Sequence, residues 1–250
     1  MVFFVLYSFL IASCTLTDAF AGSIYLQGEK DGGEGITIVL DPGHGGHDSG
    51  AMGPGGLKEK DIALSLAQAV KKRLSNHYNV LLTRTDDYWI DVEERTAMAN
   101  RNKAKLFISI HTGGSFRHKA SGLATFYWSG EKTKRVSHIL GAAEEWGTES
   151  GSAEWERIQE RYLSKSRTLA GRVHKELIGL LNINDRGCRA APIYVIASAD
   201  MPAILVEVGY ATNPAEEKQL GNQVFLGIIA EGVSKGITAF VQEEINKLRN

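Results

Sequence analysis

The sequence is short of cysteine, of proline and of any excess of charge. Its 250 residues include two cysteines and five prolines, and its formal net charge at pH 7 is −1. This balance argues against a protein that binds nucleic acid through a broad basic surface. If the segment that carries Cys14 is removed, Cys188 is left alone and no internal disulfide can form. A hydrophobic fraction of 43% nevertheless predicts a globular protein with a core.

Lysine and arginine are also missing ahead of an apolar run near the N-terminus. Residues 2–12 are almost wholly apolar, which is short for a membrane span but suits the core of a secretory signal. An Ala-Phe-Ala triplet then supplies a cleavage pattern before Gly22. We therefore predict a signal peptide over residues 1–21 and an exported protein of the periplasm or cell envelope. Two alternatives stay open: a lipoprotein signal over residues 1–13, with Cys14 lipidated and anchoring the chain to the membrane, and a buried helix of the domain.

Strand-like and helix-like segments alternate after a glycine-rich linker at residues 22–35. The strands expected, in chain order, are residues 36–40, 79–83, 106–110, 122–128, 193–197 and 203–208. The main helices expected are a first one ending near residue 74, then residues 91–102, 167–181, 214–220 and 224–247. This alternation predicts an α/β fold: a single domain over residues 36–250, with a mixed, mostly parallel sheet of about six strands and helices on both faces.

Candidate metal ligands follow the predicted strands at their carboxyl ends. His44 follows the first strand in a glycine turn, His111 follows the third, and Glu207 lies near the end of the last, while Glu59 stands where a loop enters a helix. Such positions can converge at one edge of a parallel sheet. Two imidazoles and a carboxylate leave a tetrahedral zinc one open position, which is the catalytic pattern, and a second carboxylate can then move a proton. Because these residues are far apart in the sequence, an ordinary loop histidine remains the alternative for His44.

Six motifs in a fixed order make the prediction specific. They are DPGHGGHDSGA at residues 41–51, EKD at 59–61, TR at 83–84, Arg95 with AN at 99–100, SIH at 109–111, and PAILVEVGY at 202–210 with Asn213. Over about residues 36–241 the chain resembles the zinc-dependent N-acetylmuramoyl-L-alanine amidases of the amidase 3 type.

This resemblance implies both a cofactor and a reaction. His44, Glu59 and His111 would bind one Zn²⁺ ion, and Glu207 would be the general base that activates the attacking water. The bond cut would be the amide between N-acetylmuramic acid and the first L-alanine of the peptidoglycan stem peptide. Two other functions stay open: a catalytically inactive wall-binding protein of the same fold, and a zinc carboxypeptidase acting on stem peptides. The His-x-x-Glu ligand pair common in such carboxypeptidases is missing, because position 47 is histidine.

Neighbouring residues receive weaker assignments. Asp48 is a candidate hydrogen-bond partner for a ligand histidine, or else a turn-stabilising residue. His47 is expected to face solvent or substrate, and Arg95 is expected to be a structural pairing residue. Arg186 and Arg189, on a predicted loop, are either contacts for stem-peptide carboxylates or solvated surface charges.

Two departures from the family pattern carry their own expectations. Many relatives follow the second zinc histidine with Ala-Asn, whereas this chain has Thr-Gly-Gly at residues 112–114, which puts the cleft floor beside His111 in doubt. Residues 131–164 form a long, polar and charged insertion in which we expect one short helix on each side of a turn. By analogy it is a candidate regulatory segment, with Glu144 or Glu154 blocking the metal until an activator protein moves it. The alternative is a solvated helical pair. The expected partner is peptidoglycan rather than nucleic acid, and the expected state is a monomer.

Overall fold

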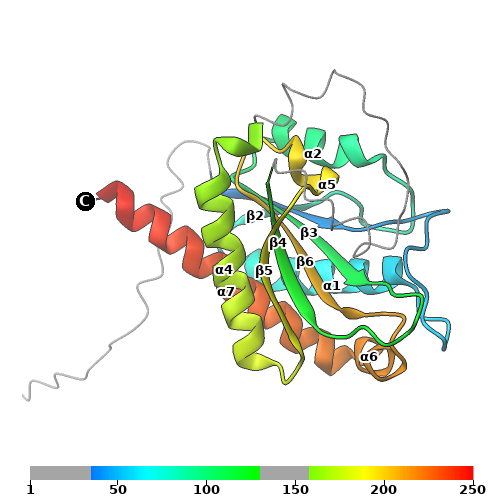
Figure 1. Cartoon of the computed structure of the whole chain (residues 1–250). Coiled ribbons are helices and arrows are strands. Elements are labelled where there is room, and N and C mark those ends of the chain that lie inside the picture. Colours follow the sequence, from blue (N-terminus) through cyan, green and yellow to red (C-terminus); the bar gives the residue numbers. More distant parts are fainter. Residues whose placement is uncertain (1–34, 130–157, 250) are drawn as a thin grey trace, which may run out of the picture. The chain divides into compact units, whose positions relative to one another are not determined.

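A single mixed sheet runs through the computed structural model, which describes residues 35–129 and 158–249 (Figure 1). Its strand order in this part of the chain is β2-β1-β3-β6-β4-β5. β1, β2, β3 and β6 are parallel, whereas β4 runs antiparallel to β6, and the edge strand β5 runs parallel to β4. The predicted mixed, mostly parallel six-stranded sheet is confirmed. The bounds are β1 (Thr37–Pro42), β2 (Asn79–Leu82), β3 (Leu106–Gly113), β4 (Leu123–Trp128), β5 (Asp185–Ala191) and β6 (Ala203–Tyr210).

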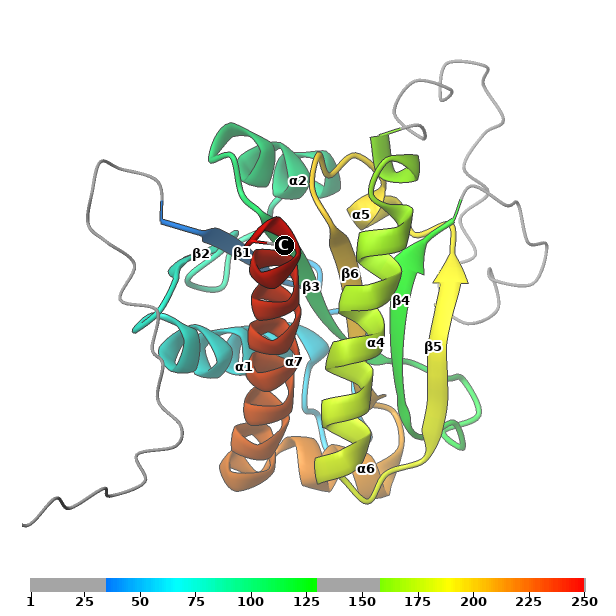
Figure 2. The ribbon, with the colours of Figure 1, turned by 90° about the vertical axis from the view of Figure 1, so that its left-hand side faces the viewer.

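Helices cover both faces of the sheet, as predicted. α7 packs against α1 and α4 in front of the sheet in Figure 2, whereas α2 and α5 pack together on the other face. The short helix α6 connects β6 to α7. The bounds are α1 (Glu59–Leu74), α2 (Val92–Arg101), α4 (Leu163–Leu180), α5 (Tyr194–Ala197), α6 (Pro214–Leu220) and α7 (Gln223–Arg249).

Side chains on the two faces of the sheet belong to two separate hydrophobic clusters. Ile108 of β3 belongs to the larger cluster under α1, α4 and α7, whereas Phe107 and Leu205 belong to the smaller cluster next to α5. Side chains alternate between the faces of a strand. His111 and Glu207 therefore lie on the face of the smaller cluster, just beyond its apolar members toward the carboxyl ends of β3 and β6.

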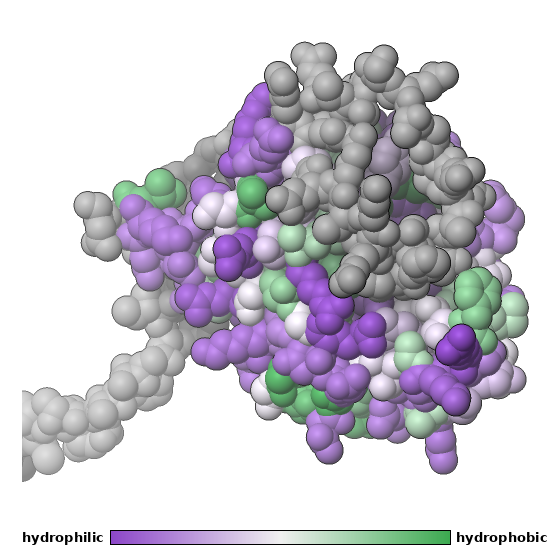
Figure 3. Space-filling view, viewed as in Figure 1, coloured by the Kyte–Doolittle hydropathy of each residue, from purple (hydrophilic) through white to green (hydrophobic). Residues whose placement is uncertain are grey.

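Helix α7 is long and apolar enough over Gln223–Leu248 to cross a membrane, by length and composition only. Its buried side chains, among them Ile229, Val233 and Ile237, belong to the larger core cluster. Its apolar character is therefore accounted for by packing against α1 and α4. In Figure 3 polar side chains cover most of the described surface on the face shown, with hydrophobic ones in small separate groups.

The strand predicted at residues 193–197 was wrong. The edge strand is β5, over Asp185–Ala191, and the apolar segment after it forms the short helix α5, whose Ile196 is fully buried. A polar, half-exposed edge strand carries little hydrophobic pattern, whereas a short apolar run looks the same in a strand and in a buried helical turn. Arg186 and Arg189 accordingly lie in β5 and not on a loop.

Several other predictions lie wholly or partly outside the described residues. The signal, the linker to residue 34 and the candidate blocking residues Glu144 and Glu154 are among them. From residue 158 the chain is described again, and α4 begins at Leu163 rather than at Arg167.

Candidate catalytic metal centre

His44 is held in a left-handed turn directly after β1. Its φ is 60°, and Gly45 and Gly46 follow with φ values of 129° and 59°. A paired backbone contact between Gly45 and Asp48, with N···O distances of 3.0 and 3.1 Å, closes the turn. The Asp48 carboxylate lies 2.6 Å from Nδ1 of His44. With the Nδ1 proton donated to Asp48, Nε2 of His44 is the ring nitrogen left free to bind a metal.

Two buried arginines fix the backbone of this turn. Arg84 is fully buried and donates to the carbonyls of Pro42 and Gly43. Arg95 donates to the carbonyls of Pro42 and His44 and forms an ion pair of 2.9 Å with the fully buried Asp41. The structural pairing role predicted for Arg95 is confirmed. These contacts tie the His44 turn to the segment after β2 and to α2.

Glu59, the first residue of α1, joins the two histidines. Its Oε1 atom lies 3.1 Å from Nε2 of His44 and 3.0 Å from Nδ1 of His111. Backbone N–H groups of Thr112 and Ala51 donate to Oε1 and Oε2 respectively, both at 2.9 Å. Ligand atoms of the three side chains all lie within 4.8 Å of one another. The predicted convergence of His44, Glu59 and His111 is confirmed, and the cluster can bind a metal ion.

Glycine is required where the backbone passes these ligands. A Cβ at Gly43 would lie 2.3 Å from Cε1 of His111, and one at Gly50 would lie 2.6 Å from Cδ2 of His44. Both distances are shorter than carbon atoms tolerate, so the glycines of the first motif leave room for the imidazole rings as well as for the turn.

The charges in the cluster are strongly coupled. Burial alone would lower the pKa of His44, but hydrogen bonds and charge from Glu59 and Asp48 outweigh it and raise that pKa to about 9. Burial would likewise raise the pKa of Glu59, yet His111 and His44 hold it far below its usual range. A buried carboxylate between two imidazoles attracts positive charge, and a divalent cation supplies that charge as protons do.

Glu207 of β6 is the register partner of His111. Glu207 is 2% exposed, and this burial raises its pKa to about 7 against the opposing effect of the Tyr210 side chain. The positive charges of Arg186 and Arg189 also act on this carboxylate, since both lower its pKa. A buried carboxylate with a pKa near neutrality can both accept and return a proton.

Arg186 and Arg189 are differently placed. The Arg186 guanidinium lies 5.1 Å from the centre of the Tyr210 ring. Arg189 is exposed and pairs with Phe126 of β4, which pairs in turn with Leu205 of β6. This register puts Arg189 on the sheet face that carries Glu207. The role of both arginines as contacts for stem-peptide carboxylates stays a prediction.

The sequence did not single out Tyr210, Arg84 or Trp89. Tyr210 and Arg84 lie within the motifs at residues 202–210 and 83–84, whereas Trp89 lies outside the six motifs. Nothing in the sequence pattern assigned a role to any of the three. His47, which we expected to face solvent or substrate, is exposed and its ring lies 4.6 Å from that of Trp89.

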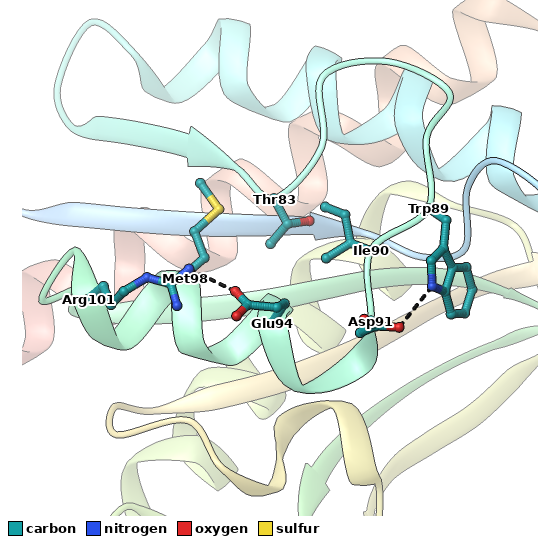
Figure 4. A pocket seen from close by; sticks show the side chains of 7 residues that line it. All are labelled: Thr83, Trp89, Ile90, Asp91, Glu94, Met98 and Arg101. Carbon is teal, nitrogen blue, oxygen red and sulfur yellow. Dashed lines mark hydrogen bonds and ion pairs between the residues drawn. The ribbon is translucent and has the colours of Figure 1, made fainter.

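A cavity of about 300 Å³ lies beside α2 (Figure 4). Within it the Trp89 indole donates to Asp91, and Arg101 pairs with Glu94. None of the proposed metal ligands lines it, and neither does Glu207, so this cavity is separate from the metal centre. Its lining residues are Thr83, Trp89, Ile90, Asp91, Glu94, Met98 and Arg101.

Comparison with known proteins agrees with this arrangement. The amidase 3 family model, described as N-acetylmuramoyl-L-alanine amidase, matches residues 38–239. The chain belongs to this family. The amidase is 32% identical over 228 residues to N-acetylmuramoyl-L-alanine amidase AmiA of Escherichia coli, covering 86% of this chain and 78% of AmiA.

A second relative and a solved structure extend the likeness. The amidase is 32% identical to AmiC of Neisseria meningitidis over 88% of its own length, but it spans only 56% of that longer protein. Its fold is similar to that of the amidase AmiC2 of Nostoc punctiforme, with a TM-score of 0.66 and 31% identity over 84% of this chain and 99% of the other.

Proposed function

We propose that this N-acetylmuramoyl-L-alanine amidase is a zinc enzyme in which His44, Glu59 and His111 hold the metal and Glu207 moves the proton. The substrate is peptidoglycan, and the bond cut joins N-acetylmuramic acid to the L-alanine of the stem peptide. The observation that carries the proposal is the meeting of the three ligand side chains within 4.8 Å, with Glu207 beside His111 in register.

The donor set suits zinc better than it suits calcium or magnesium. Two imidazole nitrogens and one carboxylate oxygen are a frequent ligand set of catalytic zinc and leave a coordination position open for water or substrate. Calcium and magnesium prefer oxygen ligands alone. The contact from Asp48 to Nδ1 of His44 supports the same view, because a carboxylate behind a ligand histidine fixes its tautomer.

The chain's own residues then have defined tasks. When bound, zinc supplies a Lewis acid that makes the attacking water more acidic and the amide carbonyl more electrophilic. Glu207 accepts the proton from the attacking water and returns it to the departing L-alanine nitrogen. Backbone N–H groups of Ala51 and Thr112 keep the Glu59 carboxylate in place during both transfers.

Product analysis on purified muropeptides tests this function. Incubation should release free lactyl ends and new L-alanine amino groups, whereas a carboxypeptidase would release terminal D-alanine and a binding protein would yield no product. Glu207→Gln should keep its zinc and lose about 10²- to 10⁴-fold in turnover. Loss of zinc in that variant would instead make Glu207 a ligand and contradict the role proposed for it.

Export to the cell envelope is a proposal that rests on the sequence alone. Residues 1–21 have the apolar core and cleavage pattern of a signal. N-terminal sequencing of the protein recovered from the envelope should begin at Gly22. A lipid-modified N-terminus at Cys14 would favour the lipoprotein alternative, with the chain held at the membrane.

A further inference from the structure

The cavity beside α2 has the size and the lining of a small ligand site (Figure 4). Its volume of about 300 Å³ falls at the lower end of the range for pockets that hold small molecules. One side of it is a face of α2, since Glu94, Met98 and Arg101 follow one another at helical spacing. The segment after β2 contributes Trp89 and Ile90. Apolar and charged side chains therefore share one small space.

The Trp89 indole is accessible to solvent and yet held in its orientation. The residue is 38% exposed, and its Nε1–H donates to the Asp91 carboxylate at 2.9 Å. Its ring also lies 4.6 Å from that of His47, three residues after His44. An aromatic surface that is exposed and already oriented loses little conformational freedom when a ligand packs on it.

Asp87 joins the segment that carries Trp89 to the turn that carries His44. One of its carboxylate oxygens accepts from the N–H of Gly46 at 2.7 Å, and the other pairs with Lys60 at 2.7 Å. Lys60 also donates to the Gly46 carbonyl at 2.8 Å. These contacts fix the Trp89 side of the cavity relative to the turn, so a molecule bound there lies beside the metal centre.

The charges of the cavity favour an uncharged ligand with hydroxyl and amide groups. Asp91 and Glu94 are both carboxylates, and the Arg101 guanidinium is already paired with Glu94 at 2.8 Å. The carboxylates of a stem peptide would meet like charge here. Hydroxyl and amide groups can instead donate to the carboxylates and accept from the guanidinium. An N-acetylated sugar ring carries such groups at its edge and presents an apolar face to an indole.

We propose that this cavity binds an uncharged N-acetylhexosamine ring of the peptidoglycan glycan strand, a neighbour of the unit whose amide is cut. The ring packs on Trp89, and its polar groups contact the α2 side chains. The proposal rests on the function proposed above and deepens it. Because the amide is attached to the glycan strand, neighbouring sugar rings pass close to the metal centre, and the cavity gives one of them a place.

Direct binding is tested with tetra-N-acetylchitotetraose, an uncharged sugar oligomer that has no stem peptide and no bond for the amidase to cut. In calorimetric titrations of the full chain, the wild type should bind it, and Trp89→Ala should bind it about 10-fold more weakly. Tyr194→Ala is the matched control, because Tyr194 is an exposed aromatic residue outside the cavity lining. No binding by the wild type, or equal affinity in Trp89→Ala, would overturn the proposal.

Kinetics separate a sugar contact from a structural role of Trp89. On peptidoglycan fragments with long glycan strands, Trp89→Ala should raise KM about 10-fold and leave kcat unchanged. On a substrate with a single N-acetylmuramic acid ring, which leaves the cavity empty, both constants should equal those of the wild type. A fall in kcat on this small substrate would mean that the indole acts through the His44 turn, and it would overturn the proposal.

Met98→Phe provides a second variant that leaves Trp89 in place. The larger side chain from α2 should fill part of the cavity, weaken binding of the oligomer and raise KM on long strands, with an unchanged melting temperature. Wild-type affinity in this variant would place the sugar outside the cavity and overturn the proposal. Absence of lactyl products from a wild-type protein that still binds the oligomer would instead overturn the proposed function.

Discussion

His111 on β3 and Glu207 on β6 are register partners on neighbouring parallel strands. Side chains paired in this way lie on the same face of the sheet. The imidazole proposed to bind the metal and the carboxylate proposed to move the proton are therefore spaced by the backbone hydrogen bonds of the central sheet. His44 and Glu59 are brought to this pair from a turn and from a helix start, which need separate support.

Burial of Glu207 should make the stability of the metal-free protein depend on pH. Its folded-state pKa of about 7 lies above the ordinary 4.5, so the folded protein binds this proton more tightly than the unfolded chain does. Stability from this group is present below about pH 4.5 and is lost as the pH rises to about 7. The Glu207→Gln variant has no carboxyl group at this position to titrate. Its free energy of unfolding relative to that of the wild type should therefore rise by roughly 2–3 kcal/mol between pH 4 and pH 8. Urea unfolding of both proteins at both pH values measures this change. The same difference between variant and wild type at the two pH values would contradict the prediction.

Removing the charge behind His44 should weaken metal binding. Asp48→Asn keeps an oxygen for the Gly50 N–H but loses the carboxylate that accepts the Nδ1 proton of His44. Zinc affinity, measured by competition with a chelator, should fall about 10- to 100-fold. Asp86→Asn is the control, because the Asp86 side chain is exposed and its carboxylate accepts from the neighbouring Asp87 N–H, away from the two histidines. Equal affinities for both variants would show that Asp48 only stabilises the turn.

A methyl group at Gly43 should displace His111. The added Cβ would lie 2.3 Å from Cε1 of that ring, so the ring must leave its place beside Glu59. Gly43→Ala should therefore lose zinc and at least about 10-fold in activity. Gly171→Ala, in α4 where a Cβ meets nothing within 4 Å, should retain both. Zinc content by atomic absorption and turnover on muropeptides check this, and a fully loaded, active Gly43→Ala protein would refute it.

Breaking the buried ion pair between Asp41 and Arg95 should destabilise the fold more than breaking an exposed pair of the same type. Asp41→Ala leaves Arg95 with an unpaired buried charge and should cost about 3–5 kcal/mol in the free energy of unfolding. Glu94→Gln removes the exposed pair with Arg101 and should change the free energy of unfolding much less, because water screens an exposed ion pair. Guanidinium unfolding of both variants gives the comparison. Similar small losses would mean that the turn does not depend on Asp41.

Much of the fold could be predicted because buried parallel strands are apolar runs. The strands that became β1, β3 and β6 were recognised in this way, and their ends carry His44, His111 and Glu207. The edge strand β5 was missed because its side chains are polar and partly exposed. Only the assembled sheet shows that β5 brings Arg186 over the Tyr210 ring of β6.

The sequence by itself determined the chemistry: which residue types are available, and that each stands at a strand end or helix start where a metal centre can form. Tertiary structure alone decided the distances among them and the supporting contacts, from the arginines under the His44 turn to the Asp87 contacts that tie the Trp89 segment to it. The reason is that hydrophobic periodicity records which face of a strand is buried. The space between two side chains depends instead on strand register and on atoms contributed by distant segments, and periodicity does not record these.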